Sequence, residues 1–270
     1  MCRLALPTLA LVLLSACAPP RAAQRDGSAV VPVRLAPPVY ANAYLLLGDR
    51  GPVVVDPGSA SDGDARRLDH TLREHGAGPE DVVLVILTHA HADHAGGAAR
   101  LQALGAHVLA GAGDLHAYEA GHNDTLRAMG LEAEFVKAAF IHEESFPPLT
   151  PDLLLDDAPG RASLDLRPYG LAGRAVRLPG HTPGSIGVLL DGGEAIAGDV
   201  VRGGYMGGRL SHGRPLTHYF HEDRGRARAA VRALVRWGAE RLYVGHGGPL
   251  EAGRLAEWAG VSSAADDEAR

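Results

Sequence analysis

The sequence predicts an α/β fold, in which strands and helices alternate along the chain and pack in layers. The first observation is the order of short apolar runs and longer amphipathic segments over residues 30–110, which follows the pattern β, β, β, α, β, α, β. The second is that a β…α pattern returns over residues 175–260. The third is composition: 270 residues, 46% of them hydrophobic, can form a large core in one or two domains.

The elements of the first part follow from apolar runs and turn residues. Strands are expected at residues 30–35, 40–47 and 53–55, and a helix over residues 64–75 ends at the glycines and proline that follow it. The remaining elements of this part are a buried strand at 82–87, a helix from 96 to 104 and a short strand at 107–110.

Residues 111–170 differ from the segments on either side. They are polar and acidic, and prolines gather in their second half. We expect an insertion that covers a site and carries short helices, rather than a piece of the sheet. The fold then resumes with strands at 175–178, 186–190, 194–197 and 241–244 and helices at 224–237 and 255–260. The domain is expected to cover residues 30–262, followed by an acidic tail over 263–270.

The N-terminal segment, residues 1–16, is expected to be a signal peptide and not part of the fold. Arg3 precedes an apolar run over residues 4–14 that is too short to span a bilayer as a stable helix. The sequence Leu14-Ser15-Ala16-Cys17 resembles a bacterial lipobox, which implies cleavage before Cys17 and acylation of that cysteine. The alternative is an ordinary secretory signal cut near Ala16 or Ala18.

Lipidation of Cys17 would tie the chain to a membrane through a flexible tether over residues 17–29. Several acyl chains anchor a protein stably, so we expect an exported protein on the periplasmic side of the cell envelope. Ala18 after the cysteine favours the outer membrane. The other cysteine, Cys2, lies within the signal, so we expect neither a disulfide nor a cysteine metal ligand.

The charge of the chain bears on its partners. Charged residues make up 21% of the sequence, the net charge is -6, and the arginines are scattered. A nucleic-acid partner would require a basic surface, so none is expected. No pattern identifies a protein partner, and a small-molecule substrate is the expected partner.

A dense polar group follows the predicted buried strand at residues 82–87. Its sequence, Thr88-His89-Ala90-His91-Ala92-Asp93-His94, places three imidazoles and one carboxylate within six residues. Such ligands suit zinc, iron or manganese, and a loop after a core strand is a usual place for functional groups. We expect a metal site, with a chance surface cluster as the alternative. His89 and His91 should face the same side of an extended loop, whereas the adjacent Asp93 and His94 should diverge.

Three later loops carry further candidate ligands. They are Pro179-Gly180-His181-Thr182, Gly198-Asp199 and Gly245-His246. In each, one histidine or aspartate follows a glycine beside a predicted strand, where glycine lets the backbone turn sharply. Each residue alone could be structural, but together with the histidine loop they favour one shared metal centre.

These pieces together resemble the metallo-β-lactamase-fold hydrolases over about residues 30–258. The matching pieces are Asp56 after the third strand, THAHADH at 88–94, PGHTPGS at 179–185, AGD at 197–199 and GHGGP at 245–249. The combination is specific for the superfamily and not for one member of it. The resemblance implies an αββα sandwich of two mixed β-sheets flanked by helices, with the metal ions at one edge.

The resemblance also implies roles for seven side chains around two divalent metal ions, with zinc expected first and iron or manganese as alternatives. The first ion would be bound by His89, His91 and His181, the second by Asp93, His94 and His246, and both by Asp199. Such a pair would share a hydroxide and polarise a carbonyl or phosphoryl oxygen. Asp93 would orient the hydroxide and pass a proton to the leaving group.

Two more residues receive expected roles beside the metals. Asp56 would support the ligands by bonding to a ligand imidazole or to its loop backbone, with an Asx-turn before Pro57 as the alternative. Tyr205, in the glycine-rich segment after Asp199, would hold the substrate carbonyl oxygen, as a tyrosine does in related lactonases. The alternative is an exposed tyrosine on a flexible loop.

The histidines outside the matching motifs include His116, His122, His212, His218 and His221. The last three could line the substrate side of the cleft. Solvated side chains are the expectation for all five.

Asp199 narrows the expected reaction. The β-lactamases with a complete HxHxDH cluster generally lack this carboxylate, and the other β-lactamases need a cysteine ligand that is absent here. The set therefore resembles glyoxalase II and the N-acyl homoserine lactonases. Only 24 residues follow His246, too few for the glutathione-gripping domain of glyoxalase II. We expect a dinuclear metal-dependent hydrolase that uses a metal-bound hydroxide on a small ester, thioester, lactone or amide.

Three alternatives remain beside this function. The chain could be a metallo-β-lactamase acting on β-lactams. It could be a mononuclear iron dioxygenase for persulfides, a branch that resembles glyoxalase II but uses only the first metal site. It could also be a non-catalytic, lipid-anchored binding protein, although the complete ligand set argues against this.

Overall fold

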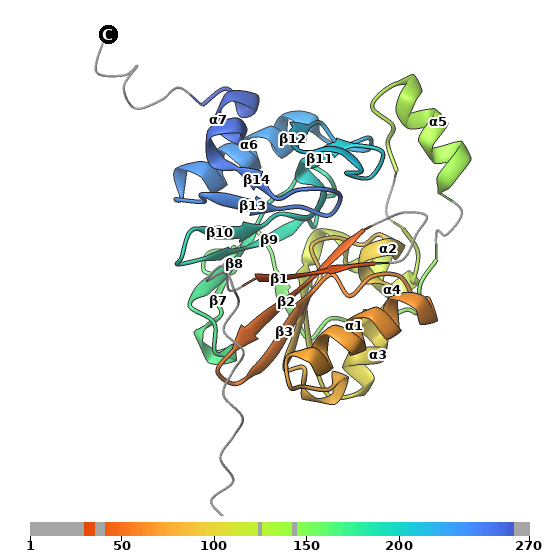
Figure 1. The fold of residues 1–270 in the computed structure, drawn as a ribbon, viewed down its shortest axis with the longest axis vertical. Helices are drawn as coiled ribbons and strands as arrows, with labels where there is room; N and C mark the ends of the chain where they lie inside the picture. Colours follow the sequence, from red (N-terminus) through yellow and green to blue (C-terminus); the bar gives the residue numbers. More distant parts are fainter. Residues whose placement is uncertain (1–29, 36–40, 124–125, 142–144, 262–270) are drawn as a thin grey trace, which may run out of the picture.

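The computed structural model describes residues 30–35, 41–123, 126–141 and 145–261. The expected signal peptide, Cys17, the tether up to residue 29 and the acidic tail lie outside the described residues. Two mixed sheets of six strands face each other and helices cover their outer faces (Figure 1), which confirms the predicted αββα sandwich. Within the described ranges, no helix has the length and apolar character needed to cross a membrane.

The first sheet has the strand order β1-β2-β3-β4-β5-β6. Its strands are β1 (Val30–Arg34), β2 (Asn42–Gly48), β3 (Gly51–Val55), β4 (Leu84–Ile86), β5 (His107–Gly111) and β6 (Leu153–Leu155). The first three pair antiparallel, and the pairs from β3 to β6 are parallel. Side chains alternate between the faces of a strand, so Val54 and Val85 pack under the helices while Val53 and Ile86 pack against the second sheet.

Four helices follow the strands of this sheet. They are α1 (Asp62–Glu74), α2 (Ala92–Ala95), α3 (Ala98–Ala103) and α4 (Leu115–Ala120). Ser61 caps α1 by accepting a hydrogen bond from the Asp64 amide, and the buried face of this helix carries Leu68 and Leu72. These leucines join Leu101 of α3 and Tyr118 of α4 in one buried cluster, which explains why the helices lie on one side of the sheet in Figure 1.

The second sheet has the order β14-β13-β10-β9-β8-β7. Its strands are β7 (Ser163–Asp165), β8 (Gly173–Arg177), β9 (Ile186–Leu190), β10 (Glu194–Ile196), β13 (Arg241–Tyr243) and β14 (Leu250–Glu251). Its outer face is covered by α6 (Arg224–Arg236) and α7 (Ala252–Ala259). Val231 and Leu234 of α6 are buried in one cluster with Leu242 of β13, so the amphipathic stripe of the predicted helix faces the sheet.

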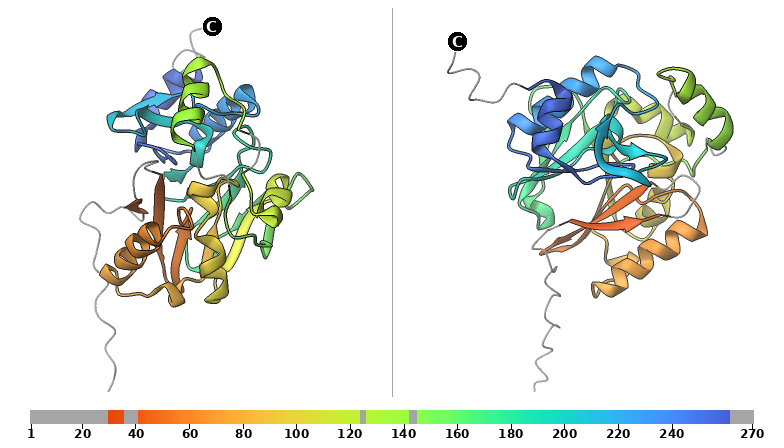
Figure 2. Two further views of the ribbon diagram at one scale, coloured as in Figure 1. Left: turned by 90° about the vertical axis from the view of Figure 1, so that its right-hand side faces the viewer. Right: turned by 45° about the horizontal axis from the view of Figure 1, so that its top comes forward.

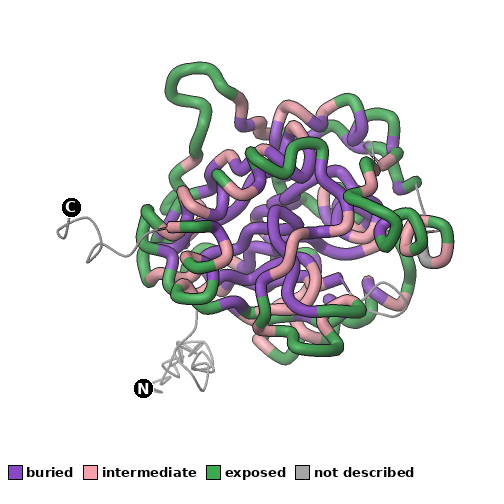
Figure 3. Tube along the Cα trace, turned by 90° about the horizontal axis from the view of Figure 1, so that it is seen from above, coloured by how far each residue is buried: buried purple, intermediate pink, exposed green. Residues whose placement is uncertain are grey.

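The main core lies between the two sheets. Ala175, Val188 and Ile196 of the second sheet share a fully or nearly fully buried cluster with Val53 and Ile86 of the first. Figure 3 shows these buried segments through the middle of the molecule, with exposed loops around them. Such a core fixes the ends of the strands, and these ends carry the candidate site.

Residues 111–170 contribute more to the sheets than the sequence predicts. β6 pairs parallel with β5, and β7 pairs antiparallel with β8, so this segment supplies an edge strand to each sheet. Strands of three residues are too short to show a period, which is why they were not predicted. The rest of the segment includes α4 and α5 (Leu131–Phe140), and α5 stands away from the sandwich in Figure 1 and in the right-hand view of Figure 2.

The glycine-rich segment after Asp199 is also more regular than the flexible loop that the sequence suggests. It forms a two-stranded hairpin of β11 (Arg202–Tyr205) and β12 (Leu210–Leu216). Four short 3-10 turns complete the described elements, at Pro79–Asp81, Ala112–Asp114, Arg167–Tyr169 and Gly198–Val200.

Candidate metal centre

The predicted metal ligands come from four segments that each follow a strand. His89, His91, Asp93 and His94 follow β4, with the last two inside α2. The other three segments follow β8, β10 and β13, and they carry His181, Asp199 and His246 respectively. Five of these seven side chains are buried or nearly so, and only Asp93 and His246 keep partial exposure, with 26% and 13% of their side chains accessible.

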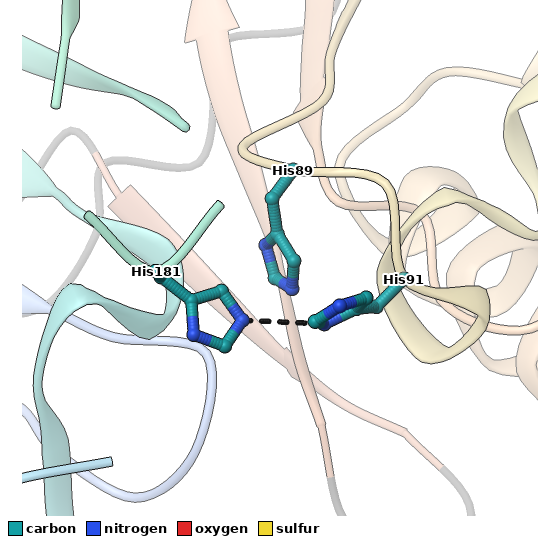
Figure 4. Close-up of side chains that lie close together, drawn as sticks. All are labelled: His89, His91 and His181. Atoms are coloured by element: carbon teal, nitrogen blue, oxygen red, sulfur yellow. Dashed lines mark hydrogen bonds between the residues drawn. The ribbon is translucent and has the colours of Figure 1, made fainter. Parts of the chain in front are cut away.

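His89, His91 and His181 form the first group. One ligand atom from each lies within 4.8 Å of the others. The ring centroid of His89 is 4.5 Å from that of His91 and 4.5 Å from that of His181. Figure 4 shows the three rings turned toward one another, with Nε2 of His181 at 3.2 Å from Nδ1 of His91. The expectation that His89 and His91 face the same side of their loop agrees with this geometry.

Asp93, His94 and His246 form the second group, within the same 4.8 Å limit. Oδ2 of Asp93 lies 3.5 Å from Nε2 of His94 and 3.4 Å from Nε2 of His246. The expectation that Asp93 and His94 diverge is therefore wrong. They belong to the single turn α2 and not to an extended loop, so the alternation of side chains in an extended segment does not apply to them.

Asp199 lies between the two groups. Its Oδ2 is 3.8 Å from Nε2 of His89 and 3.7 Å from Nε2 of His181 in the first group. The same oxygen is 3.6 Å from Nε2 of His94 and 3.5 Å from Nε2 of His246 in the second. One carboxylate oxygen is thus shared by imidazoles of both groups, which is the arrangement expected of a bridging ligand.

Asp56 positions the imidazoles of His94 and His89 through contacts on their Nδ1 side, directly for His94 and through Thr88 for His89. Its Oδ2 lies 3.0 Å from Nδ1 of His94, and its Oδ1 accepts a hydrogen bond of 2.8 Å from the Thr88 amide. The Thr88 hydroxyl donates to Oδ2 of Asp56 at 2.6 Å and lies 2.9 Å from Nδ1 of His89. The carboxylate therefore reaches both a ligand imidazole and the ligand loop, rather than closing an Asx-turn. Holding each Nδ1 in this way leaves Nε2 to face the centre.

The polar atoms at this centre fit metal ions as the missing partners. Nε2 of His89, Nε2 of His94 and Oδ1 of Asp199 are fully buried and have no hydrogen-bond partner. A buried polar atom without a partner is costly, so such atoms point to a group that completes them. Neutral imidazole nitrogens and carboxylate oxygens are the donors that bind zinc, iron and manganese. The residues present therefore fit a pair of divalent ions.

Burial and charge set the protonation of the site. Burial lowers the pKa of His89 and of His181 well below the usual value, which keeps these imidazoles in the neutral, metal-binding form. Burial acts in the same direction on His94, but the carboxylates, Asp93 foremost, outweigh it and raise its pKa to about 10. Burial also opposes the charge on Asp93, yet His94 and His246 hold the pKa of Asp93 well below its usual value. The carboxylates thus attract positive charge into the centre.

Two glycines make room for this arrangement. A Cβ on Gly245 would collide with Oδ1 of Asp199 and would lie 2.7 Å from Cε1 of His94. Gly198 has φ of +54°, a conformation that favours glycine, and a Cβ there would collide with the Thr88 hydroxyl. Both positions require glycine because side chains of the centre approach the backbone closely, those of Asp199 and His94 at Gly245 and that of Thr88 at Gly198.

Asp114 is a functional position that the sequence analysis missed. It is fully buried, and its carboxylate accepts hydrogen bonds from the Ala90 amide at 3.1 Å, the Thr182 hydroxyl at 2.7 Å and the Gly184 amide at 2.6 Å. It therefore ties the loop of His89 to the loop of His181, which belong to different sheets. The sequence could have indicated this role, because Asp114 comes just after strand β5, at the same edge of the sheet as the ligand loops.

Two of the histidines that were expected to be solvated are buried in the structure. His218 and His221 keep only 6% and 1% exposure, and Nε2 of His218 lies 3.2 Å from Oδ2 of Asp199. Both residues follow β12, whose pairing with β11 was not predicted, so their burial could not be read from the sequence. The other three, His116, His122 and His212, are exposed as expected.

Tyr205 lies at the end of β11 and is 38% exposed. Its ring centroid is 5.9 Å from the guanidinium carbon of Arg202 and 5.9 Å from that of Arg214. The ring is therefore placed among arginines on the hairpin and not in either group of predicted ligands.

The profile of the family described as the metallo-beta-lactamase superfamily matches residues 36–246. Among curated proteins, the chain is 26% identical over 181 residues to the probable metallo-hydrolase YqgX of Bacillus subtilis, covering 63% of this chain and 70% of that protein. It is 34% identical over 160 residues to a hydroxyacylglutathione hydrolase of Anaeromyxobacter dehalogenans, covering 58% of this chain. The chain spans only 45% of the length of that hydrolase.

Solved structures agree with the fold. The chain matches the metallo-beta-lactamase family protein TTHA1429 of Thermus thermophilus with a TM-score of 0.60 and 25% identity, over 89% of this chain and 79% of that one. It matches TTHA1623, solved in a di-iron-bound form, with a TM-score of 0.57 and 26% identity, over 84% of this chain and 97% of that one.

Proposed function

The chain belongs to the metallo-beta-lactamase superfamily, and from this premise we propose that it is a dinuclear metal-dependent hydrolase of a small ester, thioester, lactone or amide. It is a probable metal-dependent hydrolase by its similarity to two curated hydrolases and by its buried His and Asp clusters. The number of ions, the reaction step and the substrate class are the proposal.

The observation that carries the proposal is the position of Asp199. Its Oδ2 lies 3.5 to 3.8 Å from imidazole nitrogens of both ligand groups. A mononuclear site, as in the iron dioxygenase alternative, would use the first group alone. The second group is complete here, because Asp93, His94 and His246 converge within 4.8 Å. A shared carboxylate between two full groups supports two ions.

The reaction would depend both on the bound ions and on Asp93. When bound, two divalent ions would lower the pKa of a water to about 7, so that hydroxide is available to attack at neutral pH, and would polarise the carbonyl oxygen. Asp93 is the most exposed of the carboxylates at the centre, with 26% of its side chain accessible. It can therefore contact an entering substrate and orient the attacking oxygen by accepting a hydrogen bond from it. It can then take up the proton that this oxygen loses and donate it to the leaving group.

A cavity of about 510 Å³, a volume within the range of small-molecule sites, is partly lined by residues near the metal centre in sequence. It lies beside the metal centre and not in it: Gly247 and Gly248, next to His246, line it, whereas the predicted ligands do not. The arginines that line it are Arg34, Arg67 and Arg209. A substrate that extends from the metal centre into this cavity would meet positive charge, which favours an anionic group on the substrate.

The test is a hydrolysis screen on the purified, metal-loaded chain. It should contain esters, thioesters, lactones, amides and β-lactams, each with and without a carboxylate. Hydrolysis of an ester, thioester, lactone or simple amide that stops after chelation would support the proposal. Activity confined to β-lactams, or oxygen consumption with a persulfide, would replace it with one of the alternatives. No turnover of any member would overturn it.

The metals are proposed to be zinc, with iron or manganese as alternatives. Neutral imidazole and carboxylate ligands accept all three. The di-iron form of TTHA1623 shows that a related protein binds a pair of iron ions. Elemental analysis of protein purified without added metal distinguishes the three.

The chain is also proposed to be exported and lipid-anchored at Cys17 on the periplasmic side of the envelope. The support is the sequence Leu14-Ser15-Ala16-Cys17 after an apolar run. Mass spectrometry of the N-terminal peptide should show an acylated Cys17. A free thiol at Cys17, or cleavage near Ala18, would contradict the anchor without affecting the hydrolase proposal.

A further inference from the structure

His218 enters the metal centre from a segment outside the motifs that carry the predicted ligands. It follows β12, and its neighbours fix its position: the Thr217 carbonyl accepts a hydrogen bond of 2.9 Å from Nε of Arg202, and Phe220 forms a bridge with Ala128. His218 itself is 6% exposed. The side chain is thus held in the core of the site by its backbone.

The imidazole of His218 is nearer to Asp199 than any predicted ligand imidazole. Its Nε2 lies 3.2 Å from Oδ2 of Asp199, whereas the predicted ligands lie at 3.5 to 3.8 Å. The His218 ring is also 4.8 Å from the His181 ring and is stacked at 5.7 Å on the His246 ring. It therefore lies beside the shared carboxylate, between one ligand of each group.

His218 and His181 are anchored to the same carbonyl. Nδ1 of His181 lies 2.8 Å from the Phe220 oxygen, and Nδ1 of His218 lies 3.3 Å from it. Nδ1 of His218 also lies 3.3 Å from the Phe220 amide nitrogen, which can donate to it. In the tautomer in which Nδ1 donates to the oxygen, as Nδ1 of His181 can, Nε2 of His218 carries a lone pair toward Asp199. A divalent ion beside Oδ2 of Asp199, 3.2 Å away, would select this tautomer by binding the lone pair, whereas in the other tautomer Nε2 donates a hydrogen bond to that oxygen. His181, Asp199 and His218 indeed offer three ligand atoms within 4.8 Å of one another.

We propose that His218 is an additional protein ligand of the metal pair, binding through Nε2 beside Asp199. The inference rests on the proposed two-metal function and extends the predicted ligand set by one nitrogen. An extra imidazole raises the coordination number of the ion it binds above the four that structural zinc prefers. The ligand set would then suit an ion that accepts more ligands, such as iron or manganese, as well as zinc.

The test compares cobalt(II) binding to the full chain and to two variants, His218→Gln and His218→Ala. Glutamine keeps an N–H that can donate to Asp199 but has no imidazole nitrogen. The visible spectrum of bound cobalt reports its coordination, and titration against a competing chelator gives its affinity. We expect both variants to change the spectrum and to weaken the affinity of one cobalt ion by at least tenfold.

His221→Gln is the matched control. It is the same substitution three residues away, at a histidine that is 1% exposed and belongs to none of the ligand groups. It should keep the spectrum and affinity of the original chain, and circular dichroism should show that all variants fold. If His218→Gln keeps the cobalt spectrum and affinity of the original chain, His218 serves only as a hydrogen-bond donor, and the inference is overturned. This conclusion holds whatever His218→Ala shows. Failure of the original chain to bind two cobalt ions would instead overturn the proposed function.

Discussion

Oδ2 of Asp56 lies 3.0 Å from Nδ1 of His94, and both side chains are 1% exposed. Asp56 has φ of +52°, a left-handed conformation that is uncommon for residues other than glycine. The carboxylate at the end of β3 is thus held in a sparsely populated backbone conformation and touches a ligand imidazole after β4. Strain of this kind persists where the surrounding structure enforces it, commonly at functional sites.

Asp56→Asn should weaken metal binding about 10- to 100-fold, since residues that orient ligand imidazoles typically have this effect. Asparagine tolerates the left-handed backbone, so the substitution removes the charge with little backbone cost. Chelator competition with the purified variant measures the change. Asp191→Asn, at an exposed position, is the control. An unchanged metal affinity in Asp56→Asn would contradict the orienting role.

Asp93→Ala should lower kcat at least about a hundredfold, because it removes the group that accepts and returns the proton. It should also weaken the binding of one metal ion, since Asp93 belongs to the second ligand group. The fold should be largely intact, because the side chain is partly exposed. Kinetics and metal analysis on one preparation check this. Turnover that stays within a few-fold of the original would show that the assigned mechanism is wrong.

Gly245→Ala should disturb the centre through volume alone. The added Cβ would collide with Oδ1 of Asp199, and overpacking of a buried site costs about 1–3 kcal/mol. We expect lower stability in denaturant and weaker metal binding together. Gly253→Ala is the matched control, since nothing lies within 4 Å of a Cβ at that position in α7. Equal behaviour of the two variants would mean that Gly245 is not tightly packed against Asp199.

Asp114→Ala should destabilise the fold by about 2 kcal/mol or more. It would leave the Ala90 amide, the Thr182 hydroxyl and the Gly184 amide without their acceptor in a buried place. Urea unfolding gives the change in free energy. Asp191→Asn again serves as the exposed comparison. A loss below about 0.5 kcal/mol would show that other groups replace the carboxylate in joining the two loops.

The regular elements were the part of the fold most accessible to prediction. α1, α6 and β9 are each long enough for a period or an apolar run to be visible. β6 and β14 have three and two residues, and their pairing depends on partners distant in sequence, so no local pattern could reveal them.

The same contrast holds for the site. His89 to His94 form a dense local cluster, and the glycines before His181, Asp199 and His246 mark the other loops. Asp114 and His218 carry no such marker. Their roles arise only when the ends of separate strands meet, because each contacts residues at least 19 positions away in the chain.

The two-metal proposal depends most on Asp199, which would be shared by both ions. The most direct measurement is the metal content of the folded chain after loading and removal of excess ion, compared with Asp199→Ala. We expect two equivalents of metal per chain for the original and a loss of at least one equivalent in the variant. Less than one equivalent on a well-folded original chain, or an unchanged two equivalents in Asp199→Ala, would contradict it.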